Sequence, residues 1–146
     1  MDKTMEILPH LSAYQPALLA LALLCMSVLA QSFVLGPFEF AKGEQSPGMP
    51  LKGDHSLFSF RAIRTHMNSV ENLPAFAVTV LLAILLDVDV AVVNWLAVIH
   101  LVLRLVFCVT YYSGVGKVAG GPRTLSYVGG WLSNVVLSGY VIAALI

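Results

Sequence analysis

Four long apolar runs, separated by short polar or glycine-rich stretches, dominate this 146-residue sequence. They lie at residues 14–35, 57–86, 90–112 and 122–146, and a helix needs about 20 such residues to cross a membrane. Charged side chains make up only 11% of the chain and hydrophobic ones 58%, which leaves too few polar groups to cover a small soluble domain. The sequence therefore predicts an all-α, integral membrane four-helix bundle that forms a single domain in the lipid bilayer.

Composition also excludes several classes of function. The formal net charge is zero, whereas proteins that bind nucleic acid carry an excess of basic residues, so we expect no nucleic-acid partner. The two cysteines, Cys25 and Cys108, both lie inside apolar runs, where cysteine behaves as a small hydrophobic residue. Their positions argue against a disulfide framework and against a metal site, which needs clustered cysteine and histidine residues.

The basic residues predict the orientation of the bundle. Six of the eight lie near the first and third loops: Lys42, Lys52, Arg61, Arg64, Lys117 and Arg123. The turn from Asp87 to Asp89 has none, and Lys3 alone favours the reverse orientation. Because the cytoplasmic loops of membrane proteins carry an excess of lysine and arginine, we expect the loop at 36–56 to face the cytoplasm and both termini to face the opposite side.

Several ionisable residues fall at the depth of the membrane. The clean apolar part of the second span, residues 73–86, rises only about 21 Å, whereas the hydrocarbon core is about 30 Å thick. Polar residues before it must therefore enter the membrane, and Glu71 is one of them. Long arginines that reach back to the interface would account for Arg61 and Arg64. They would not account for Glu71, or for Arg104 within the third span, and ionisable residues inside a membrane commonly mark functional sites.

Helix geometry predicts which of these residues meet. If the second and third spans form an antiparallel hairpin, Glu71 and Arg104 lie at the same depth and are expected to pair. The same count places four more polar residues in one layer near the cytoplasmic face: Arg64, Asn68, Tyr111 and Arg123. Arginine suits a carboxylate or phosphate, a carboxylate suits an amine, and asparagine and tyrosine add neutral hydrogen bonds. This layer predicts a site for an elongated anionic ligand, and a polar network that only joins the helices is the alternative.

The same residues carry a resemblance to a known family. Residues 61–76, which read RAIRTHMNSVENLPAF, resemble the second-helix signature of the membrane-associated proteins in eicosanoid and glutathione metabolism, abbreviated MAPEG. Residues 104–111, RLVFCVTY, and 122–127, PRTLSY, resemble that family's third helix and the start of its fourth. The resemblance covers essentially the whole chain and is that of a shorter, bacterial-type member, which implies the bacterial inner membrane as its location.

The resemblance implies a fold, an assembly and a chemistry. It implies a homotrimer of four-helix protomers that binds glutathione, as a cosubstrate, between neighbouring subunits near the cytoplasmic face. MAPEG enzymes of the microsomal glutathione transferase type activate the glutathione thiol. The thiolate then conjugates to a hydrophobic electrophile, reduces a lipid hydroperoxide or takes part in an isomerisation, and no metal is implied.

The resemblance also implies roles for individual residues. Arg64, Asn68 and Glu71 would hold the carboxylates and the amine of glutathione. Tyr111 would hydrogen-bond its backbone, and Arg123 would be the catalytic residue that stabilises the thiolate. Four further positions are implied as contacts or supports: Asn72, Arg61, Arg104 and Tyr127. The role of Arg123 is physically sound, because a free thiol has a pKa of about 8.5 and a nearby guanidinium favours its charged form.

Two other functions are alternatives to a glutathione transferase or peroxidase. A non-catalytic, trimeric lipid- or partner-binding protein would keep the same fold without activating a thiol. A small proton or anion conductor would use Glu71, Arg104 and His100, although four spans give little room for a transport path within one protomer. The joint presence of Arg64 and Arg123 with the polar residues of the second span favours the enzyme.

Overall fold

The computed structural model describes residues 9–42, 53–116 and 120–146. Over these residues a short 3-10 helix is followed by four α-helices: η1 (Pro9–Tyr14), α1 (Gln15–Lys42), α2 (Phe58–Leu85), α3 (Val90–Ser113) and α4 (Pro122–Leu145). All four α-helices are long and apolar enough to cross a membrane, and the described residues contain no strand. The expected all-α, four-helix fold is confirmed.

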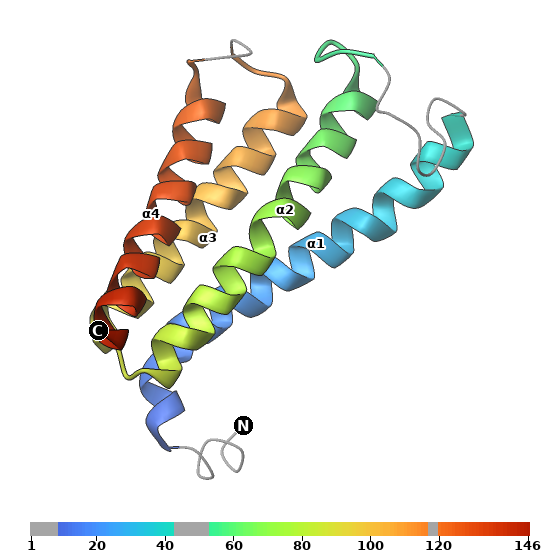
Figure 1. Ribbon diagram of the computed structural model, residues 1–146. Helices are drawn as coiled ribbons and strands as arrows, with labels where there is room; N and C mark the ends of the chain where they lie inside the picture. Colours follow the sequence, from blue (N-terminus) through green and yellow to red (C-terminus); the bar gives the residue numbers. More distant parts are fainter. Residues whose placement is uncertain (1–8, 43–52, 117–119) are drawn as a thin grey trace.

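The helices run alternately up and down, so consecutive helices are antiparallel (Figure 1). The α2–α3 turn and the C-terminus lie at one end of the bundle, and the start of α2, the end of α3 and the start of α4 lie at the other. Asp89 caps α3, because its Oδ1 accepts a hydrogen bond from the Val92 backbone N–H at 3.0 Å. The Tyr14 hydroxyl donates to the Val88 backbone oxygen at 2.7 Å, which fastens the start of α1 to the same turn.

The apolar core occupies the half of the bundle near the α2–α3 turn. Its buried members come from all four helices and the turn: Tyr14, Ala17, Ala20, Leu24, Phe76, Val80, Ala83, Ile84, Val88, Val93, Ala97, Leu137 and Val141. The opposite half contains buried polar side chains, among them Thr65, Ser69, Arg104 and Ser126. The two halves of the membrane-spanning bundle therefore differ in chemistry.

Helix α3 packs against α4 at Gly130. A Cβ atom at this position would lie 3.4 Å from Cδ of Arg104, an ordinary van der Waals distance, so the arginine stem lies directly against this part of α4. The His100 ring is held just above, because its Nδ1–H donates to the Gly130 carbonyl at 2.8 Å. The same ring stacks on Phe76 with 4.0 Å between centroids. His100 is thus a bonded interhelical histidine.

One helix boundary differs from the expectation. The sequence predicts that Gly36 and Pro37 end the first helix, but α1 continues to Lys42. A proline removes one backbone hydrogen bond, and this loss alone does not stop the residues on either side from remaining helical. Of the expected loop at 36–56, residues 43–52 lie outside the described residues and include Lys52. Residues 117–119, which include Lys117, lie outside them as well.

Candidate functional site

A cavity opens in the half of the bundle that contains the buried polar residues. Its volume is about 390 Å³, within the range of small-molecule sites. The wall comes from α2, α3, α4 and the residues just before α2: His55, Phe60, Arg64, Asn68, Glu71, Phe107, Tyr111, Arg123 and Tyr127. Six of the nine predicted site residues thus line one cavity. The other three, Arg61, Asn72 and Arg104, lie outside its wall.

One face of α2 supplies both a guanidinium and a carboxylate. Arg64, Asn68 and Glu71 follow one another at spacings of four and three residues, which places them on the same side of the helix. Arg64 Nη1 lies 3.9 Å from Glu71 Oε1, and the two side chains are 44% and 54% exposed. An ion pair this long and open contributes little to stability. Both groups are therefore available to a ligand that carries a carboxylate and an amine.

The facing wall places a guanidinium over a phenol ring. Arg123 lies in the first turn of α4, directly after Pro122, which suits the start of a helix because no backbone N–H is needed there. The Arg123 Cζ lies 4.5 Å from the centroid of the Tyr111 ring, a cation–π distance. Tyr111 is buried, and Phe107 packs on it with 5.3 Å between ring centroids. A positive charge and a hydroxyl are therefore held against the same cavity.

Arg104 lies inside the bundle, behind the cavity. Only 3% of its surface is exposed, and its Nη2 donates to Asn68 Oδ1 at 2.7 Å. The expected pairing of Glu71 with Arg104 is therefore wrong, because Arg104 binds Asn68 and Glu71 lies beside Arg64. The Glu71 side chain is on the open side of α2, whereas Arg104 is buried between helices.

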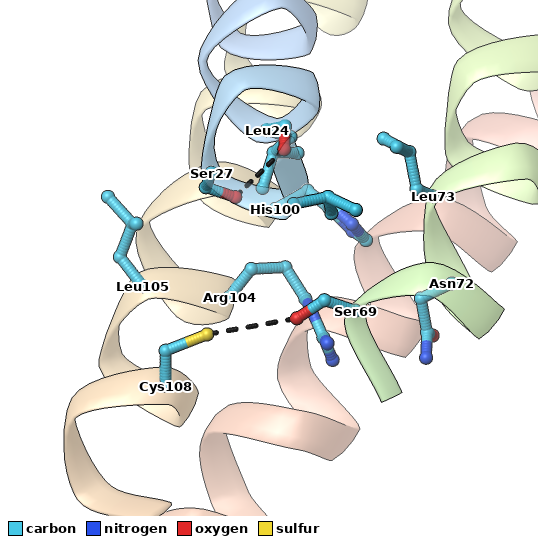
Figure 2. A pocket seen from close by; sticks show the side chains of 10 residues that line it. Leu24, Ser27, Ser69, Asn72, Leu73, His100, Arg104, Leu105 and Cys108 are labelled. Carbon is cyan, nitrogen blue, oxygen red and sulfur yellow. Dashed lines mark hydrogen bonds between the residues drawn. The ribbon is translucent and has the colours of Figure 1, made fainter. Parts of the chain in front are cut away.

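A small void adjoins Arg104 (Figure 2). Its volume is about 20 Å³, enough for a single water molecule, which needs about 10–15 Å³. Arg104 Nη1 is buried and has no hydrogen-bond partner among the described residues. The Ser69 hydroxyl and the Cys108 sulfur, 3.9 Å apart, line the same void. Asn68 is thus the principal polar partner of a buried positive charge.

The two remaining predicted residues make their hydrogen bonds outside the cavity wall. Arg61 donates to the backbone oxygens of His55 and Ser56, both at 2.8 Å, and to that of Tyr112 at 3.3 Å. It therefore ties the segment before α2 to the end of α3. Asn72 Nδ2 donates to the Asn68 backbone oxygen at 2.8 Å, so its amide is engaged within α2.

A model of the MAPEG family matches residues 16–143, nearly the whole chain. The matched range contains every residue of the cavity wall. This chain belongs to the MAPEG family. MAPEG includes glutathione transferases and related membrane proteins, and with four membrane-spanning helices this member is an integral membrane protein. No individual curated protein matches the chain.

One polar residue of this MAPEG cavity is not among the predicted site residues. His55 lies before α2, where no helical periodicity relates it to a face of the bundle. In the folded chain its Nδ1 lies 3.2 Å from the Tyr111 hydroxyl oxygen, and it lines the cavity. The only signal in the sequence is a histidine six residues before the arginine that begins the second-helix signature.

Proposed function

We propose that this MAPEG protein binds glutathione in the cavity and activates its thiol for attack on a hydrophobic electrophile or a lipid hydroperoxide. The observation that carries this proposal is the joint placement of Arg64, Glu71, Tyr111 and Arg123 around one open cavity. Glutathione is an elongated tripeptide with two carboxylates, one amine and one thiol. Each of these groups has a complementary side chain in the cavity wall.

The binding roles follow from charge. Arg64 and the Asn68 amide would take a carboxylate of glutathione, and Glu71 would take its amine. Tyr111 would hydrogen-bond the peptide backbone, and Tyr127 would form part of the wall. The three predicted residues outside the cavity wall would not touch glutathione and would instead position other parts of the site. Arg104 would orient the Asn68 amide to which it is bonded, Arg61 would hold the segment before α2, and Asn72 would extend the polar face of α2.

Arg123 would supply the catalytic step. A guanidinium close to the glutathione sulfur lowers the energy of the thiolate, which is the nucleophilic form. The nucleophile then belongs to the cosubstrate, so the protein needs no reactive cysteine of its own.

A second hollow of about 510 Å³ lies along α2 and α4, shares Glu71 with the cavity and is lined by Trp131, Val135 and Ile142. Because this hollow is mainly apolar and adjoins the cavity, it supports the proposal that the second substrate is hydrophobic and arrives from the bilayer.

The decisive experiment is spectroscopic. Detergent-solubilised protein is expected to produce the ultraviolet absorbance of a thiolate when glutathione is added at neutral pH, where free glutathione is only a few per cent ionised. A glutathione analogue with a methyl group in place of the thiol is the matched control. It should compete for the same site and produce no absorbance.

Three results separate the candidate functions. A saturable thiolate signal supports the proposed enzyme. Saturable binding of glutathione without a thiolate signal would instead favour a non-catalytic, trimeric lipid- or partner-binding protein of the same fold. Absence of binding at millimolar glutathione would overturn both the site and the function proposed for it.

The proposal includes an assembly and an orientation. Arg64 and Glu71 remain half-exposed at the open side of the cavity, so a neighbouring subunit of a homotrimer would complete the site. Arg61, Arg64 and Arg123 lie toward one end of the bundle and Asp87 and Asp89 at the other, which supports a cavity facing the cytoplasm from a bacterial inner membrane. Native mass spectrometry of the solubilised protein is expected to give the mass of three chains, and a monomer at all detergent concentrations would contradict the assembly.

A further inference from the structure

His55 is a fixed part of the cavity although it precedes the first turn of α2. Its ring meets Phe60 edge-on with 5.0 Å between centroids, and its Nδ1 lies 3.2 Å from the Tyr111 hydroxyl oxygen. Its backbone oxygen accepts a hydrogen bond from Arg61 Nη1 at 2.8 Å. Two contacts, to α2 and α3, hold the imidazole ring against the cavity, and the hydrogen bond from Arg61 holds the His55 backbone.

His55 also differs chemically from the rest of the wall. The other ionisable side chains in the described cavity wall are arginines, tyrosines and a glutamate, whose ordinary pKa values lie well away from neutrality. Imidazole is the side chain that exchanges a proton near neutral pH. If a thiol loses its proton in this cavity, His55 is the group in the wall that is suited to receive it.

The surroundings keep His55 neutral before a ligand binds. Burial lowers the pKa of His55 most, and the positive charge of Arg123 lowers it next. Arg61 and Arg64 act in the same direction, and the carboxylate of Asp54 opposes them. A neutral imidazole with its proton on Nε2 offers Nδ1 as an acceptor.

We propose that His55 accepts, through the Tyr111 hydroxyl, the proton that glutathione loses when its thiol is activated. The proposal rests on the proposed function. The S–H bond breaks and its electron pair stays on the sulfur, which lies next to the Arg123 guanidinium. The thiol proton passes to the Tyr111 oxygen, while the proton of that hydroxyl passes to His55 Nδ1. The products are a thiolate, a neutral tyrosine and an imidazolium.

The geometry of the wall and the charge of glutathione support this route. Arg123 Cζ lies 4.5 Å from the Tyr111 ring, so a sulfur held by Arg123 lies beside Tyr111, and Tyr111 is in turn in hydrogen-bond contact with His55. Glutathione also changes the charge balance. Its carboxylates offset the arginines that disfavour an imidazolium, and the new thiolate attracts one. The acceptor thus becomes more basic as the ligand binds.

Rapid mixing of glutathione with the full-length protein tests the route. His55→Asn keeps a hydrogen-bonding group near the position of Nδ1 but cannot accept a proton at neutral pH. We expect it to slow thiolate formation by about 10²-fold or more, with affinity for the methyl analogue of glutathione unchanged. The wild-type rate should fall as acid protonates His55, and the variant should lack this fall. His66→Asn, outside the cavity wall, is the matched control and should behave as wild type.

Chemical rescue separates proton transfer from positioning. Added imidazole should restore the rate of thiolate formation in His55→Ala, and should not do so in Tyr111→Phe, which breaks the route at its centre. If His55→Asn keeps the wild-type rate and pH profile while wild-type protein shows its thiolate, His55 only positions Tyr111 and the proposal is overturned. If wild-type protein binds glutathione without forming a thiolate, the proposed function fails and this inference fails with it.

Discussion

Replacing Arg123 with alanine is expected to remove most of the thiolate absorbance and to lower turnover about 10²- to 10³-fold, as loss of one donor to a developing anion does in other enzymes. The guanidinium is the positive group held against Tyr111 on the α3–α4 wall, and it stabilises charge that is absent from the unreacted thiol. Affinity for glutathione should fall less, by about tenfold. The measurements are the thiolate spectrum, kcat and equilibrium binding of glutathione.

Two further variants make this result specific to the guanidinium. Arg123→Lys retains the charge without the planar fork and is expected to recover part of the thiolate signal. Thr124→Ala changes the neighbouring residue, whose hydroxyl accepts a hydrogen bond from the Gly120 backbone N–H, and should leave turnover within about twofold of wild type. A full thiolate signal in Arg123→Ala would show that another group stabilises the sulfur.

The depth of each site residue in the membrane could be predicted from this sequence, because it depends on only a few quantities. The rise of a helix per residue and the thickness of the hydrocarbon fix how far Asn68 and Tyr111 lie from the interface. Once Asp87 to Asp89 are recognised as a tight turn, α2 and α3 share one register. The four residues that this count places in one layer, Arg64, Asn68, Tyr111 and Arg123, accordingly line one cavity.

Rotation about the helix axis could not be predicted in the same way. Counting residues from the α2–α3 turn puts Glu71 and Arg104 at one depth, yet Glu71 is on the open side of α2 and Arg104 is buried between helices. An apolar helix presents little contrast between its faces, so its hydrophobic pattern does not determine which face turns inward. His55 shows a second limit. Its place depends on the path of a connecting segment, and no sequence period describes that path.

The Asn68–Arg104 contact beneath the cavity yields the second large effect. Replacing Asn68 with leucine is expected to lower the free energy of unfolding by about 2–3 kcal/mol, because a buried guanidinium loses the acceptor of its 2.7 Å hydrogen bond. Unfolding in mixed micelles with increasing SDS measures this change. Asn134→Leu is the matched control, since Asn134 Oδ1 is buried without a partner among the described residues. That variant should be as stable as wild type or more stable.

Arg104→Met tests whether the charge is the cause, since it removes the guanidinium and keeps an apolar side chain of similar length. Added to Asn68→Leu, it is expected to restore stability to within about 1 kcal/mol of wild type, because no charge is then left unpaired. If the changes in the free energy of unfolding of the two single variants simply add, another group compensates the charge of Arg104. The double variant should still bind glutathione poorly, because the Asn68 amide is gone. If the double variant regains its stability but still binds glutathione poorly, the buried Asn68–Arg104 pair serves binding rather than folding.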